Sequence, residues 1–228
     1  MVRKMTAVCL LLLLLTGPLY YLTARADSPP SYNAEQIYEM SADSVFYIRV
    51  LSGDGAVKAT GTGVVLSEDG LAATACHVVK DAERVEAVLP SGRVVRQVEV
   101  VSYDEQTDAA IVRLPKPSST STGGTGYKAF ALRDGAVHYG EAVFTIGYPL
   151  AGTPMITTGI VSTPKAFING RNRILTSSQI VSGMSGGPMI DSQGRLAGIN
   201  SGSLRTMNNI HLVIDMNDVR SLLAATNR

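Results

Sequence analysis

The sequence predicts an all-β fold, for three reasons. Between Val45 and Ile214 the chain is a series of short runs rich in valine, isoleucine, threonine and tyrosine, each about as long as a β-strand. Turn residues separate the runs, for example at Ser52–Gly55, Ser67–Gly70 and Pro90–Gly92. No repeat with a period of about 20 to 50 residues accompanies them. Short strands separated by turns in this way are typical of antiparallel barrels.

The strands are expected in two sets, separated by a connector. The first set is Val45–Leu51, Thr60–Leu66, Leu71–Thr74, Arg84–Leu89, Arg93–Tyr103 and Ala109–Leu114. The second set is Ala142–Ile146, Met155–Val161, Ile174–Thr176, Pro188–Ile190, Ala197–Asn200 and His211–Ile214. Residues 115–127 between the sets are rich in proline, serine, threonine and glycine, and such a segment has little to bury. We expect it to be a flexible connector.

The remaining segments complete the domain organisation. Asp215 is a good N-cap for a closing helix over residues 216–226, and a short helical turn is expected around His77. The Pro-rich segment Asp27–Ser31 predicts a spacer, and Tyr32–Met40 after it predicts a short amphipathic lead-in. The expected divisions are an N-terminal spacer (27–41) and one folded domain (42–226), whose first half covers about 42–115 and second half about 128–215.

Residues 1–26 have the features of a signal peptide. Two basic residues precede an apolar run centred on Leu10–Leu15, and Ala24-Arg25-Ala26 has the small-x-small pattern of a cleavage site. An uncleaved membrane anchor is the alternative, because Met5–Thr23 is nearly long enough to span a bilayer. The cleavage site favours removal. In either case we expect the folded part to be exported, to the periplasm or out of the cell, without a stable membrane partner after cleavage.

Composition excludes several classes of function. Removing residues 1–26 leaves 17 of the 20 Lys and Arg residues against 19 Asp and Glu, a formal charge of −2 that provides no basic surface for nucleic acid. Cys76 is then the only cysteine, so an intramolecular disulfide cannot form. One thiol with one neighbouring histidine cannot make a metal site, and we expect Cys76 to be a buried apolar residue. We expect no metal and no cofactor.

A glycine-rich segment around Ser185 predicts a nucleophile. Gly183-Met184-Ser185-Gly186-Gly187-Pro188 can form a tight turn that brings backbone N–H groups close to a substrate carbonyl. A serine hydroxyl needs a base to take its proton and a third group to orient that base. His77 and Asp108 lie upstream and provide both. A plain hairpin turn at Ser185 is the alternative, but it would not require a matching His and Asp.

The order of these residues excludes an α/β-hydrolase. Gly183-x-Ser185-x-Gly187 also fits the nucleophile elbow of that fold, in which the acid and the histidine follow the serine. Here the order is His77, Asp108, Ser185, and the residues after Ser185 are too few for the rest of a doubly wound sheet. The order is that of chymotrypsin-like enzymes.

Several segments together resemble the HtrA/Deg branch of the trypsin-like serine proteases. They are Gly61–Leu66 running to His77–Val79, Thr107–Val112, Gly147–Pro149, Thr158–Ser162 and Gly183–Pro188. The resemblance covers about residues 42–226. It implies two six-stranded antiparallel β-barrels of the chymotrypsin-like fold, with the active site in the cleft between them and a short C-terminal helix.

The resemblance also implies roles for individual residues. His77 would be the general base, Asp108 its orienting acid and Ser185 the nucleophile, and the N–H groups of Gly183 and Ser185 would form the oxyanion hole. Ser201 matches a position whose hydroxyl often supports the aspartate, and an ordinary strand-end serine is the alternative. The substrate-binding residues implied are Gln179, Ile180, Asn200, Ser201 and Ser203. We therefore expect an exported serine endopeptidase that cuts protein or peptide substrates through an acyl-enzyme.

Two departures from the family pattern bear on this expectation. Met184 stands where asparagine is usual in this branch, so an apolar side chain must hold the oxyanion loop. The chain ends soon after the expected helix, so we expect the protease domain without an appended PDZ domain. The alternative function is a pseudoprotease, a peptide-binding module on the same fold. The sequence does not indicate an oligomeric state or a regulator.

Overall fold

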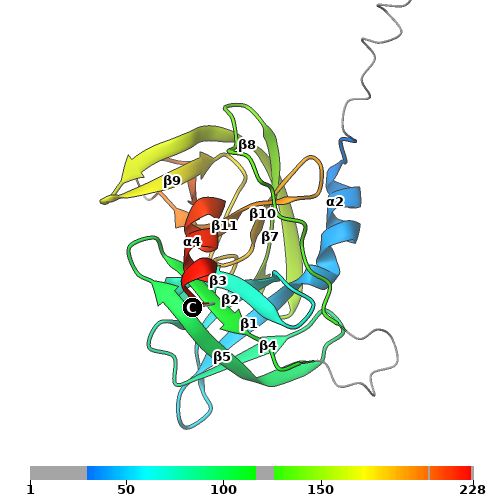
Figure 1. Ribbon diagram of the computed structural model, residues 1–228, viewed down its shortest axis with the longest axis vertical. Coiled ribbons are helices and arrows are strands. Elements are labelled where there is room, and N and C mark those ends of the chain that lie inside the picture. Colours follow the sequence, from blue (N-terminus) through cyan, green and yellow to red (C-terminus); the bar gives the residue numbers. More distant parts are fainter. Residues whose placement is uncertain (1–29, 117–125, 205, 227–228) are drawn as a thin grey trace, which may run out of the picture. The chain divides into compact units, whose positions relative to one another are not determined.

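The computed structural model describes residues 30–116, 126–204 and 206–226, with elements labelled as in Figure 1. All the elements belong to one compact unit, Tyr32–Arg228. The first barrel closes in the order β1-β2-β3-β6-β5-β4. Its strands are β1 (Val45–Leu51), β2 (Val57–Val65), β3 (Leu71–Ala75), β4 (Arg84–Val88), β5 (Val94–Asp104) and β6 (Ala109–Arg113).

The second barrel closes in the order β10-β11-β12-β9-β8-β7. Its strands are β7 (Ala142–Leu150), β8 (Thr153–Ile168), β9 (Arg171–Thr176), β10 (Pro188–Asp191), β11 (Leu196–Ser203) and β12 (His211–Asp215). All strand pairs within both barrels are antiparallel. The expected pair of six-stranded antiparallel barrels is confirmed.

Strands β8 and β9 form a longer hairpin than the sequence analysis predicts. They continue past Val161 and pair as far as Ile168 opposite Arg171. The turn between them is Asn169-Gly170, and both residues have positive φ values, 50° and 80°. Positive φ at both central residues is the requirement of the type I′ turns that join antiparallel strands.

The helical segments are α2 (Ala34–Ser41), the 3-10 turn η1 (Ala42–Ser44), α3 (Cys76–Val79) and α4 (Met216–Thr226). The expected spacer thus contains a helix, which Asn33 and Gln36 cap reciprocally and whose Ile37 side chain is fully buried. Helix α4 contacts strands of both barrels (Figure 1). The predicted signal peptide (1–26) and most of the predicted connector lie outside the described residues.

No helix in the three described segments is both long enough and apolar enough to cross a membrane.

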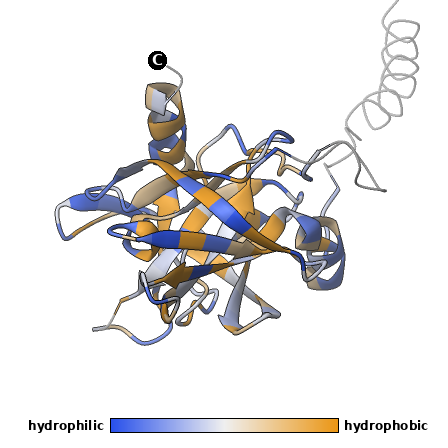
Figure 2. Cartoon of the chain, turned by 90° about the horizontal axis from the view of Figure 1, so that it is seen from below, coloured by the Kyte–Doolittle hydropathy of each residue, from blue (hydrophilic) through white to orange (hydrophobic). Residues whose placement is uncertain are grey.

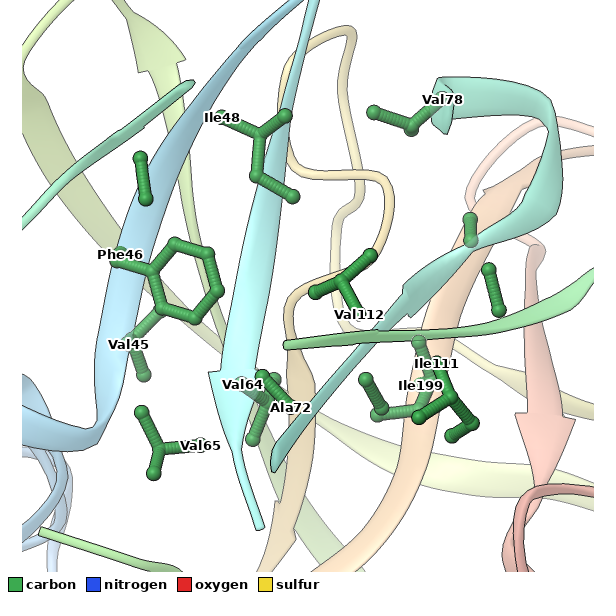
Figure 3. Packing of buried hydrophobic residues seen from close by; sticks show 14 of the residues in the cluster. Val45, Phe46, Ile48, Val64, Val65, Ala72, Val78, Ile111, Val112 and Ile199 are labelled. Carbon is green, nitrogen blue, oxygen red and sulfur yellow. The ribbon is translucent and has the colours of Figure 1, made fainter. Parts of the chain in front are cut away.

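Buried apolar side chains connect the two barrels. Figure 2 shows strands banded in alternating hydrophilic and hydrophobic colours, as expected where only one face of a strand is buried. In Figure 3, Phe46 and Ile48 of β1 pack in the same cluster as Ile111 of β6 and Ile199 of β11. Gly63 lies opposite Phe46, and a Cβ atom there would come within 2.2 Å of the phenyl ring. This shared core holds the loops of the two barrels in a fixed relation.

Candidate active site

The register of β3 and β6 brings His77 and Asp108 together. Ala75 pairs with Ala109, so the residues just beyond this pair meet across the strand ends. The N–H of Cys76 donates to the Asp108 carbonyl at 2.6 Å. Asp108 has φ 64°, in the left-handed region that aspartate enters more readily than most residues. This conformation turns its side chain toward the start of α3, where His77 lies.

The Asp108 carboxylate is buried and accepts several hydrogen bonds. The Nδ1 atom of His77 lies 3.0 Å from both oxygens, the His77 backbone N–H donates at 3.1 Å, and the Ser201 hydroxyl donates at 2.6 Å. Burial alone would raise the pKa of Asp108, but the hydrogen bond and charge of His77 and the bond from Ser201 together hold that pKa below its usual value.

An ionised Asp108 can only accept hydrogen bonds, so His77 must carry its proton on Nδ1. The opposite ring nitrogen, Nε2, is then free to accept a proton. The His77 side chain is half exposed, so a bound substrate can reach it.

Ser185 lies in the loop between β9 and β10. Its hydroxyl donates to the Ser201 carbonyl at 3.1 Å, and Ser201 is the residue whose side chain binds Asp108. The roles that the resemblance implies require the His77 ring to lie between Ser185 and Asp108. Both residues lie in the described part of the chain, and the His77 ring makes no hydrogen bond to this hydroxyl. Catalytic hydrogen bonds are often incomplete without substrate.

The loop from residue 183 to residue 187 leaves two N–H groups available. The N–H groups of Gly183 and Ser185 donate to no group among the described residues. The other three donate to backbone carbonyls: Met184 to Val181 (3.0 Å), Gly186 to Asn200 (2.7 Å) and Gly187 to Met184 (3.0 Å). The two available donors are the two that the sequence analysis assigns to the oxyanion hole.

Met184 anchors this loop by burial. Its side chain is fully buried in the apolar cluster of the second barrel, which also contains Ile180, Met189 and Val213. Gly147 passes so close that a Cβ atom there would lie 2.6 Å from the Met184 Cα. The loop is therefore held by packing at the position where the family usually has asparagine.

The residues predicted to bind substrate take different positions. Ile180 and Ser203 lie on facing segments, because the Ser203 hydroxyl donates to the Ile180 carbonyl at 2.8 Å. Gln179 is exposed. Asn200 is fully buried, and its Nδ2 lies 3.3 Å from the Ile146 carbonyl of β7 and 3.4 Å from the Met184 carbonyl in the loop that carries Ser185. Asn200 therefore supports the loop, and its side chain does not reach the surface.

The sequence predicts that the strand of His211 approaches the back of the substrate pocket, and in the structure the His211 ring joins these two segments. The Ile180 N–H donates to its Nδ1 at 3.3 Å, and the Ser203 hydroxyl lies 2.9 Å from the same atom. Burial lowers the pKa of His211, which favours the neutral ring that such an acceptor requires. His211 of β12 pairs directly with Ser203 of β11, and this register explains why the two side chains meet.

Cys76 is buried beside the site. Burial and the nearby Asp108 charge raise its pKa to about 11, so the thiol stays protonated at neutral pH. No cluster of three or more His, Cys, Asp or Glu side chains among the described residues could hold a metal ion.

Comparisons with known proteins agree with this class of fold. A family model for the trypsin-like peptidase domain matches residues 61–199. The chain is 31% identical over 225 residues to mitochondrial serine protease HTRA2 of Bos taurus, and the alignment covers 91% of this chain and 47% of HTRA2. It is 32% identical over 183 residues to the serine endoprotease DegS of Escherichia coli K12, covering 77% of this chain and 50% of DegS.

A solved structure shares the fold. The serine endoprotease from Yersinia pestis superposes with a TM-score of 0.72 at 26% identity, over 88% of this chain and 68% of that one. The chain therefore belongs to the trypsin-like peptidase family, in its HtrA-like branch. It spans about half the length of HTRA2 and DegS.

Proposed function

We propose that this domain is a serine endopeptidase that cleaves unfolded or accessible protein segments through His77, Asp108 and Ser185. The observation that best supports the proposal is the state of the N–H groups in the loop of residues 183–187. Those of Gly183 and Ser185 have no hydrogen-bond acceptor among the described residues, whereas the other three donate to backbone carbonyls. An oxyanion hole requires donors that are held in place and unoccupied. The relatives' names, serine protease and serine endoprotease, agree with this activity.

In the first step, Nε2 of His77 accepts the proton of the Ser185 hydroxyl while Oγ attacks the substrate carbonyl carbon. The carbonyl oxygen gains the negative charge and is bound by the N–H groups of Gly183 and Ser185. The ionised Asp108 stabilises the imidazolium that forms and holds its Nδ1 proton in place. The Ser185 hydroxyl must first leave the Ser201 carbonyl for His77.

In the second step, the imidazolium gives its proton to the leaving amine, the peptide C–N bond breaks, and an acyl-enzyme remains on Ser185. Water then attacks the ester carbonyl, with His77 taking the proton. The reverse proton transfer returns Ser185 as its hydroxyl and releases the new carboxyl end of the substrate. The same two N–H groups stabilise both tetrahedral intermediates.

We propose that the residue before the scissile bond is uncharged and small to medium in size. Gln179 stands where enzymes that cut after Arg or Lys have an aspartate. The position where glutamyl endopeptidases have a histidine is occupied by Asn200, whose buried amide carries no charge. A charged side chain would therefore lose solvent without gaining a counter-charge, at a free-energy cost of several kcal/mol. Mass-spectrometric mapping of cuts in a denatured protein should find Val, Ala, Leu and Thr at this position. A dominant preference for Arg, Lys or Glu would contradict the proposal.

We also propose that residues 1–26 direct the domain out of the cytoplasm, on the basis of their sequence alone. Their removal is measurable as the mass of the N-terminus of the mature protein. A retained N-terminus would favour the membrane-anchor alternative.

Labelling with a fluorophosphonate tests the proposed activity directly, because the reagent reacts with an activated serine. We expect the wild-type protein to be labelled at Ser185, and the Ser185→Ala variant to remain unlabelled. The pseudoprotease alternative predicts no labelling of either protein. In the structure, the bond from the Ser185 hydroxyl to the Ser201 carbonyl favours this alternative.

A further inference from the structure

Thr62, in β2 of the first barrel, makes hydrogen bonds to the catalytic loop of the second barrel (residues 183–187). Its side chain is fully buried. Its backbone N–H donates to the Ser185 carbonyl at 2.8 Å, and its backbone carbonyl accepts from the Thr74 hydroxyl at 2.8 Å. The backbone of Thr62 therefore fixes the position of the nucleophile relative to the first barrel.

The Thr62 hydroxyl makes two further bonds, and its neighbours determine their direction. The Tyr148 backbone N–H lies 3.0 Å away and can only donate, so the hydroxyl must accept from it. The Gly183 carbonyl lies 2.8 Å away and can only accept, so the hydroxyl must donate to it. One buried hydroxyl thus connects β7 to the carbonyl of an oxyanion-hole residue.

The peptide between Gly183 and Met184 is held at both ends by these contacts. Thr62 binds its carbonyl oxygen, and Val181 accepts from its N–H at 3.0 Å. This peptide lies between the N–H groups of Gly183 and Ser185, the two proposed oxyanion donors. Gly183 has φ 90°, a conformation open to glycine and able to rotate without the steric limits of other residues. No other donor among the described residues bonds the Gly183 carbonyl, so loss of the Thr62 bond would leave the carbonyl side of this peptide without a hydrogen bond.

We propose that the Thr62 hydroxyl is a positioning group that holds the oxyanion hole in its active arrangement. This inference rests on the proposed function. The hydroxyl touches neither substrate nor the reacting atoms, so its loss should lower kcat through the transition state and leave KM nearly unchanged. The His77–Asp108 pair is not bonded to this hydroxyl, so the pH dependence of kcat should be preserved.

The test compares three variants with the wild-type protein, by steady-state kinetics on a peptide substrate and by thermal unfolding. Thr62→Val keeps the shape of the side chain and removes the hydroxyl. Thr62→Ser keeps the hydroxyl. Thr176→Val is the matched control, because the Thr176 hydroxyl is equally buried, donates to the Ile160 carbonyl at 2.9 Å and accepts from the Ser178 N–H at 3.0 Å.

We expect Thr62→Val to lower kcat by about 10- to 100-fold and to change KM by less than about threefold. This loss of kcat is smaller than the roughly 100- to 1,000-fold loss that follows deletion of an oxyanion donor itself. Thr62→Ser should stay within about fivefold of the wild-type kcat. Thr176→Val should also lose thermal stability but keep kcat within about threefold. Thr62→Val removes the hydroxyl that pairs the Tyr148 N–H and the Gly183 carbonyl. Thr176→Val removes the partner of the Ser178 N–H, while the Ile160 carbonyl keeps the Ser177 N–H at 3.1 Å. Fluorophosphonate labelling rates should follow kcat.

Equal kcat values for Thr62→Val and Thr176→Val would overturn the assignment, as would a loss confined to KM. If Thr62→Val does not fold, Thr62→Ser decides: a folded serine variant with kcat lowered more than about 30-fold shows that the hydroxyl does not carry the effect. If the wild-type protein itself neither cuts nor is labelled, the proposed function fails and this assignment fails with it. An active wild type whose Thr62→Val variant keeps its kcat overturns the assignment alone.

Discussion

Replacement of Ser185 by alanine is expected to lower kcat for a denatured protein substrate by a factor on the order of 10⁶. The hydroxyl oxygen is the atom that forms the acyl bond in the proposed mechanism, so its removal leaves that bond nothing to form on. Cys76, the nearest thiol, is buried and protonated. The measurement is the initial rate of cleavage with purified protein, compared with the thermal unfolding of both forms.

His77→Ala serves as the second arm of this experiment. Residues that act as one unit give non-additive losses, so the Ser185→Ala and His77→Ala double variant should be about as slow as either single variant. Unfolding temperatures should change little, because Ser185 contributes one side-chain hydrogen bond and His77 is half exposed. Substantial proteolysis by a purified Ser185→Ala protein would exclude Ser185 as the nucleophile.

Much of the fold could be predicted because the strands are short, β-rich and bounded by turn residues. The first barrel illustrates this, since the expected strand Val45–Leu51 has the bounds that β1 has in the structure. The β8–β9 hairpin was underestimated for a local reason. Polar residues such as Lys165 and Arg171 interrupt its alternation, and the Asn169-Gly170 turn was not recognised as a hairpin signal.

The sequence predicts a short amphipathic lead-in over Tyr32–Met40, where helix α2 lies, but not the surface on which this helix packs, because burial of one side of a short helix depends on residues far away in the sequence. Ile37 is fully buried and Tyr32 donates to the Ser192 carbonyl at 2.8 Å. Neither contact has a signature in the local sequence. The capping box of Asn33 and Gln36 was the available signal for the start of this helix.

The candidate site was predictable where motif and chemistry coincide, as for His77, Asp108 and Ser185. The residues that support it were not, because their roles depend on contacts between barrels. Thr62 is distant in sequence from the loop it binds, and only the folded structure shows that its hydroxyl reaches Gly183. Asn200 was expected to line the specificity pocket, yet its burial under the catalytic loop gives it a supporting contact instead.

The Asp108→Asn substitution is expected to lower kcat by about 10⁴-fold, the size of effect found for the same change in a related triad. The substitution keeps the shape of the side chain but replaces one carboxylate oxygen with a donor. The His77 backbone N–H can only donate, so the amide oxygen must take the place of Oδ1, 3.1 Å away. The amide NH₂ then takes the place of Oδ2, 3.0 Å from Nδ1 of His77.

A donor at that position favours the His77 tautomer that carries its proton on Nε2, and this tautomer cannot accept the proton of Ser185. The negative charge that stabilises the imidazolium is lost as well. Asp104→Asn is the matched control, since its carboxylate also accepts from a backbone N–H, that of Gln106, and from a hydroxyl, that of Thr107. It should keep kcat within about threefold. The measurement is kcat for a peptide substrate near neutral pH. If Asp108→Asn lost no more activity than Asp104→Asn, Asp108 would not be the group that orients His77.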